Sequence, residues 1–272
     1  MLPADRQGRR QLRPIKRAGE TMSDTMNIDD YLAQGGILSS PSNVSPRYRG
    51  ELLRLMATFV DSELAGSAGF ADTINDAPGI KQRIAAARIT LEKTDHAERV
   101  LNVMGTFGVD TARYAVHHPW AARVARDADL GTSRQATDMR LSVFYYPLQG
   151  WVDAVVMNVL MGRAVGIQLT EFSKVSYAPL AEVFREIAPR EARHAELGVE
   201  GLQAIAQTED GRVMAKVSIA FWKPRVAASF GQSESKRFET LKKFGLRHRT
   251  NEALLADWTK DIDALLASLH LN

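Results

Sequence analysis

The chain has 272 residues, of which 45% are hydrophobic and 25% charged, and it contains no cysteine. This length can bury one sizeable core, and the lack of cysteine excludes disulfides, thiolate catalysis and thiolate metal ligands. The net charge of +3 arises in residues 1–21, which hold six Lys or Arg and two acids. Subtracting these from 35 Lys+Arg and 32 Asp+Glu leaves 29 and 30. The rest of the chain is nearly neutral and gives no reason to expect nucleic-acid binding.

The first 46 residues lack helical periodicity, and we expect residues 1–46 to form a disordered or extended arm. Residues 1–21 have no apolar stretch of the kind found in signal peptides. Met22 is a plausible second start, so residues 1–21 are interpreted as an upstream extension. The alternative is a basic arm that binds a partner. No apolar run reaches the roughly 20 residues needed to span a bilayer, and we expect a cytoplasmic protein with no membrane contact.

After residue 46 the apolar residues recur at helical spacing almost to the end of the chain. Helices are predicted over 47–65, 80–104, 111–127, 136–164, 178–205, 211–229, 234–244 and 250–268. We expect Pro147 and Gly150 to perturb the fourth of these, a break over 165–176 to follow it, and Pro189 to kink the fifth. With no alternating strand pattern, residues 47–272 are predicted to form one all-α domain. Its architecture is a ferritin-like four-helix bundle with additional C-terminal helices.

Acids and histidines fall on the four longest predicted helices in a repeated order. In chain order they are Glu63, then Glu92 and His96, then Asp153, and last Glu191 and His194. Residues three or four apart share one helix face. Four-helix bundles hold two iron ions with a Glu from each of two helices and a Glu-x-x-His from each of the other two. The pattern therefore predicts a buried centre of two metal ions, with iron or manganese as the metals that suit these donors.

Each of these residues also has a plainer interpretation. Glu63 alone is more often a surface acid, and Glu92 can form a salt bridge along its own helix. Asp153 lies among apolar residues, where a carboxylate needs a partner or a metal. On the second helix the spacing is Glu-x-x-x-His, so Asp95 competes with Glu92 as the ligand. The combination is more specific than any of its parts.

Several segments resemble the ferritin-like phenylacetate-catabolic family, which includes phenylacetyl-CoA epoxidase. They are Asp61-Ser62-Glu63-Leu64-Ala65-Gly66, Glu92-Lys93-Thr94-Asp95-His96-Ala97, Trp151-Val152-Asp153, Ser176-Tyr177-Ala178-Pro179-Leu180, Glu191-Ala192-Arg193-His194 and Gly245-Leu246-Arg247-His248. The resemblance implies a di-iron monooxygenase that inserts one atom of O₂ into an apolar, aromatic acyl-CoA substrate. The six residues above would be its metal ligands and catalytic residues. The implied partners are an electron-donating reductase and a related helical subunit or a second copy of the chain.

Two other functions remain open at this stage. The chain can be a non-catalytic helical scaffold of such a multicomponent monooxygenase, in which case it should bind little metal. It can also be a di-metal peroxidase or an iron-handling protein. If the substrate is a CoA thioester, its phosphates need Lys or Arg, and the candidates lie within residues 236–249. They are Lys236, Arg237, Lys242, Lys243, Arg247, His248 and Arg249.

Overall fold

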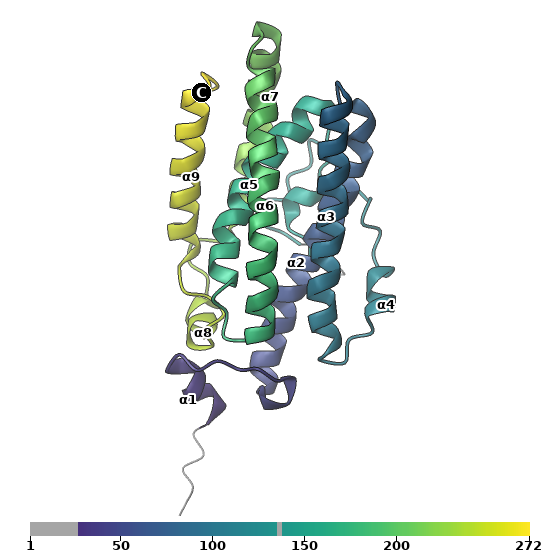
Figure 1. The fold of residues 1–272 in the computed structure, drawn as a ribbon. Helices are drawn as coiled ribbons and strands as arrows, with labels where there is room; N and C mark the ends of the chain where they lie inside the picture. Colours follow the sequence, from purple (N-terminus) through teal and green to yellow (C-terminus); the bar gives the residue numbers. More distant parts are fainter. Residues whose placement is uncertain (1–26, 135–137) are drawn as a thin grey trace, which may run out of the picture.

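The structure is a computed structural model that describes residues 27–134 and 138–272 (Figure 1). The basic segment 1–21 and Met22 therefore lie outside the described residues. All regular elements in the described part are helical, and one isolated bridge joins Leu38 to Tyr177. The predicted all-α fold class is confirmed.

Four long helices form the bundle (Figure 1). They are α2 (Pro46–Thr73), α3 (Ile80–Gly105), α5 (Gly150–Phe172) and α6 (Ala178–Ile205). Helix α2 packs along α3, α5 packs along α6, and contacts of α3 with α6 and of α2 with α5 join the two pairs. The bundle therefore consists of two helix pairs that enclose a common interior.

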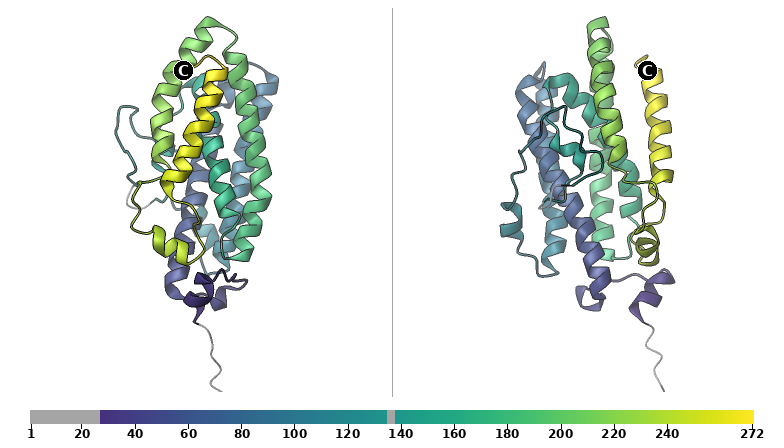
Figure 2. Two further views of the ribbon diagram at one scale, coloured as in Figure 1. Left: turned by 90° about the vertical axis from the view of Figure 1, so that its left-hand side faces the viewer. Right: turned by 180° about the vertical axis from the view of Figure 1, so that it is seen from behind.

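Further helices cover one side and one end of this bundle. Helices α7 (Glu209–Ala228) and α9 (Asn251–Ser268) both pack on α5, as Figure 2 shows from two sides. At one end, the short helices α1 (Ile28–Ala33) and α8 (Phe238–Lys243) contact each other. Helix α5 is consequently surrounded. Among the described helices it is the one long and apolar enough to cross a membrane by length and composition, and most of it is buried inside the protein.

Helices α2, α7 and α9 begin at residues whose side chains satisfy a free backbone N–H group. The hydroxyl of Ser45 accepts a hydrogen bond from the N–H of Tyr48, and Pro46 occupies the first helical position. The hydroxyls of Thr208 and Thr250 cap α7 and α9 in the same way. These three helices start within two residues of the positions that the sequence pattern predicts.

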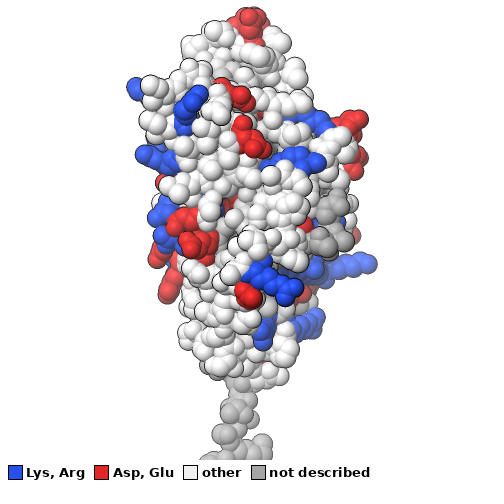
Figure 3. Space-filling view, turned by 90° about the vertical axis from the view of Figure 1, so that its right-hand side faces the viewer, with Lys and Arg blue, Asp and Glu red and all other residues white. Residues whose placement is uncertain are grey.

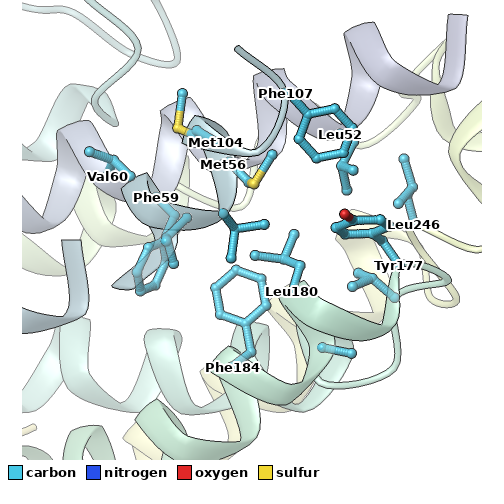
Figure 4. Packing of buried hydrophobic residues seen from close by; sticks show 14 of the residues in the cluster. Leu52, Met56, Phe59, Val60, Met104, Phe107, Tyr177, Leu180, Phe184 and Leu246 are labelled. Atoms are coloured by element: carbon cyan, nitrogen blue, oxygen red, sulfur yellow. The ribbon is translucent and has the colours of Figure 1, made fainter. Parts of the chain in front are cut away.

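Aromatic side chains join the two helix pairs in one part of the core. Phe184 of α6 points toward Phe59 of α2 (Figure 4), and the two rings meet edge to face at 5.1 Å between centroids. The ring of Phe172 lies 5.1 Å from Phe184 on its other side. Edge-to-face pairs add about 0.5–1.5 kcal/mol to the burial of the rings themselves.

The segment between α3 and α5 contains less helix than the sequence pattern predicts. The helix expected over 111–127 ends at Ala115 as the short α4, because proline at position 119 disfavours helical backbone at the residue before it. Helix α5 begins at Gly150, where φ is +79°, rather than at residue 136. Pro147 cannot donate the hydrogen bond that a continuous helix needs.

Asp61 of α2 holds this irregular segment against the bundle. Its carboxylate accepts hydrogen bonds of 2.7 Å from the hydroxyl of Tyr114 and from the N–H of Met139. Figure 2 shows the segment running outside α2. On the neighbouring face, which carries α3 and α4, basic and acidic side chains are interspersed (Figure 3).

The break predicted between the third and fourth long helices is shorter in the structure, where it covers residues 173–177. Helix α5 continues to Phe172 through the break expected over 165–176, because Leu169 is buried there and one glycine costs a helix only about 1 kcal/mol. Helix α6 runs from residue 178 to 205, as the sequence predicts, and Pro189 lies inside it. The arm expected over 1–46 contains α1, and Leu32 and Leu38 anchor it by being buried in the core.

Replacing Phe184 by alanine tests the aromatic part of the core. The side chain is fully buried, so we expect the free energy of unfolding to fall by about 3–5 kcal/mol. Equilibrium denaturation in urea measures this change. Leu91→Ala is the control, because Leu91 is 70% exposed, and it should change stability by no more than about 0.5 kcal/mol. Equal losses in the two variants would contradict this packing.

Candidate metal centre

Polar side chains from α2, α3 and α6 meet inside the bundle, and we call them the central cluster. Its members are Glu63, Glu92, Lys93, His96, Glu191 and His194. All of these side chains are buried except that of Glu92, which is 27% exposed. The cluster lies where the sequence predicts a metal centre, and Lys93 is its unpredicted member.

Lys93 lies between the two buried carboxylates. Its ammonium nitrogen is 3.2 Å from Glu63 Oε1, 3.0 Å from Glu191 Oε1 and 3.2 Å from Glu191 Oε2. An ammonium has three N–H donors and no acceptor. These three contacts can therefore occupy all of its donors, and they link α2 to α6 through α3.

His96 contacts the same two carboxylates from one turn further along α3. Its Nδ1 lies 3.0 Å from Glu191 Oε1 and 3.4 Å from Glu63 Oε2. Nε2 of the same ring is buried and has no hydrogen-bond partner in the part of the chain that the structure describes. Glu63, His96 and Glu191 each offer one ligand atom within 4.8 Å of the others, so this triad is the part of the cluster that can hold a cation.

His194 connects the interior of the cluster to its exposed edge. Its Nε2 lies 2.6 Å from Glu92 Oε2, and its ring stacks near that of His96 with 5.9 Å between centroids. Nδ1 of His194 is 3.4 Å from Glu191 Oε1 without forming a hydrogen bond. Glu92 thus belongs to the cluster through His194, not through the triad.

The positive groups of the cluster stabilise its negative ones. Burial alone would raise the pKa of Glu191, but the charge of Lys93, the nearby imidazole of His194 and the hydrogen bond from His96 hold it well below the usual range. Burial alone would lower the pKa of Lys93, yet the charges of Glu191 and Glu63 raise it. Burial also opposes protonation of His96, and the hydrogen bonds to both carboxylates outweigh it and raise its pKa. Lys93 and the two buried carboxylates therefore stabilise one another's charged forms.

Asp153 does not join the central cluster. Its carboxylate pairs with Arg126, accepts a 2.6 Å hydrogen bond from the hydroxyl of Ser218, and accepts a 3.0 Å bond from the N–H of Gln149. The sequence predicts a partner or a metal for this buried acid, and the partner is Arg126. Its guanidinium also lies 3.6 Å from the centre of the Phe221 ring.

The other acid of α5 is also engaged elsewhere. Glu171 accepts hydrogen bonds from the backbone N–H groups of His248 and Arg249, at 2.9 and 3.0 Å. Asp153 and Glu171 are the only acids in α5. The polar side chain of α5 that contacts α6 near the cluster is Asn158. Its amide donates a hydrogen bond to the backbone oxygen of His194. Helix α5 therefore supplies no carboxylate to the cluster.

These observations test whether two iron ions fit. A carboxylate-bridged pair needs about four acids and two imidazoles from four helices, whereas the cluster takes its acids from three helices and already contains an ammonium. Asp95, the competing ligand on α3, pairs with Arg99 and Arg190 at the bundle surface. The residues present do not fit a pair of metal ions, although the triad offers donors for one.

Lys93 is not among the residues predicted from the sequence, although its spacing contains the signal. It precedes His96 by three residues, which is the position of the Glu in a Glu-x-x-His pair. The intact pair on α6 is Glu191 and His194. The same three-residue spacing on α3 places Lys93 at the position where a Glu-x-x-His pair has its glutamate.

A cavity of about 840 Å³ reaches the cluster at Glu63. Apolar side chains such as Phe59, Phe144 and Leu169 line part of it. Of the basic residues proposed for CoA phosphates, those that line it are Lys236, Arg237 and Arg247. Two of these three are already engaged, since Arg237 pairs with Glu51 and Arg247 donates to Gln168 and Asn251.

Comparison with known proteins gives two findings. The profile of the family described as "Phenylacetic acid catabolic protein" matches residues 26–272. The chain is also 23% identical over 208 residues to a protein named as one subunit of the 1,2-phenylacetyl-CoA epoxidase of Escherichia coli (strain K12). That match covers 75% of this chain and 62% of the relative, so the chain spans less than two thirds of the relative's length.

Glu191→Gln tests the electrostatic description of the cluster. Removing one charge of a buried pair costs about 3–5 kcal/mol, and we expect a loss of that size at neutral pH. The folded-state pKa of Glu191 lies below its ordinary value of 4.5, so its contribution is complete above that pH and disappears as pH falls through the lowered value. Urea denaturation of both proteins over a series of pH values measures the difference.

Glu196→Gln is the control for this measurement. Glu196 lies on the same helix in an exposed ion pair with Arg193, and such pairs contribute between about 0 and 1 kcal/mol. A Glu191→Gln variant that is as stable as this control at neutral pH would show that the cluster is not held by charge.

Proposed function

Since the chain belongs to the phenylacetic acid catabolic protein family, we propose that it is a non-catalytic helical component of an oxygenase of phenylacetate catabolism. In this proposal it supports a metal-bearing relative and does not activate O₂ itself. The relative it matches is named as one subunit of an epoxidase. By this similarity, we propose that this protein is also one component of an assembly of several chains.

The observation that carries the proposal is the absence of a ligand from α5. Both acids of that helix have other partners: Asp153 pairs with Arg126, and Glu171 accepts hydrogen bonds from backbone N–H groups. A bundle that binds two irons draws inward-facing acids from all four helices. A chain that lacks one of these contributions still forms the same packed bundle, which is what a scaffold requires.

One alternative rests on specific observations of its own. The triad of Glu63, His96 and Glu191 can hold a cation. The Nε2 of His96 is buried with no hydrogen-bond partner among the described residues, and Glu63 lines the cavity. These features favour the di-iron oxygenase predicted from the sequence, acting on an apolar or aromatic acyl-CoA. The presence of Lys93 between the two carboxylates argues against it.

Metal content and O₂ consumption separate the two functions. The chain is produced with excess iron and assayed with phenylacetyl-CoA and a chemical reductant. The control is the matching chain of the Escherichia coli epoxidase, treated in the same way. We expect far less than one iron per chain and no substrate-dependent O₂ consumption. About two irons per chain together with such consumption would establish the oxygenase instead.

The assembly is tested by co-expression with a metal-bearing family member from the same genome. We expect the two chains to elute together in size-exclusion chromatography at a fixed ratio and to consume O₂ when phenylacetyl-CoA is added. Separate elution at micromolar concentrations would contradict the scaffold role.

A further inference from the structure

Building on that function, we propose that the ammonium of Lys93 is the resident cation of this bundle. It occupies the position of a metal ion between Glu63 and Glu191 and excludes divalent ions from it. In this proposal the chain folds without iron, and the site between the two carboxylates does not bind iron.

The first support is the position of Lys93 in the motif. On α6 the pair that can ligate a metal is Glu191 and His194, three residues apart, and both side chains are fully buried. On α3 the corresponding pair is Lys93 and His96, and the two imidazoles stack near each other. A lysine therefore stands where the pattern of a di-iron bundle requires a carboxylate.

The second support is the close packing of α2 against α3 where the lysine stem enters the interior. A methyl group at Gly66 of α2 would lie 3.2 Å from the ring of Phe144 and 3.6 Å from Cδ of Lys93. Beside it, Ser67 donates to the backbone oxygen of Thr90 and bonds to the hydroxyl of Thr94. These bonds fix the spacing of α2 and α3 at the point where the lysine enters the interior.

The third support is charge. A divalent ion held by Glu63 and Glu191 would lie within a few ångströms of the ammonium, and like charges in a water-poor interior repel strongly. Releasing that repulsion requires Lys93 to lose its proton or to leave the cluster. Both are opposed by the two carboxylates, to which it makes three hydrogen bonds.

Two substitutions at this position test the proposal with Co²⁺ as the probe. Lys93→Glu removes the cation and completes a Glu-x-x-His pair with His96. Lys93→Met removes the cation without adding a donor and is the matched control. Metal per chain after dialysis, the visible absorption of bound Co²⁺, and the shift of the melting temperature on adding Co²⁺ are measured for both variants and for the wild type.

We expect the wild-type protein to retain no Co²⁺ and to show no shift. Lys93→Glu should retain at least about one Co²⁺ per chain, with affinity raised by about a hundredfold or more because a repelling charge is replaced by a donor. Lys93→Met should melt at a lower temperature than the wild type and recover part of the loss in Co²⁺. If Lys93→Glu folds only when Co²⁺ is present during refolding, that result also supports the proposal.

Two outcomes would overturn it. One is wild-type protein that binds Co²⁺ as tightly as Lys93→Glu. The other is a failure of Co²⁺ to stabilise or to refold either variant. Both are distinct from a failure of the proposed function, which would appear as substrate-dependent O₂ consumption by the purified wild-type chain.

Discussion

Two carboxylates buried in the middle of a helical bundle must be compensated by positive charge, and this constraint governs the centre of the molecule. Glu63 belongs to the pair α2–α3 and Glu191 to the pair α5–α6. Lys93 donates to both, so the charge balance of the interior also joins the two halves of the bundle. Without a cation at this point, the halves would bring two negative groups together where water cannot solvate them.

The same constraint explains why the fold and the chemistry of this family can separate. The four helices pack through apolar residues such as Phe59 and Phe184, and this packing does not depend on which cation neutralises the centre. A metal pair and a lysine are two solutions to one electrostatic problem. Membership of an oxygenase family therefore establishes the architecture, whereas the activity depends on particular side chains.

The sequence predicts α3 and α6 well because apolar residues recur at helical spacing along both of them. Helices α3 and α6 begin where the pattern places them, at residues 80 and 178. The segment 106–149 was predicted poorly, because its conformation depends on tertiary contacts such as those of Asp61. At the site, helical spacing brings Glu63, His96, Glu191 and His194 together. The pairing of Asp153 with Arg126 could not be predicted, since Arg126 lies in that irregular segment.

The position of Lys93 has an evolutionary consequence. Lysine and glutamate codons differ at a single nucleotide, so one point mutation separates this interior from one with a Glu-x-x-His pair on α3. After gene duplication, a catalytic chain could thus lose its metal through one base change and persist as a stable companion.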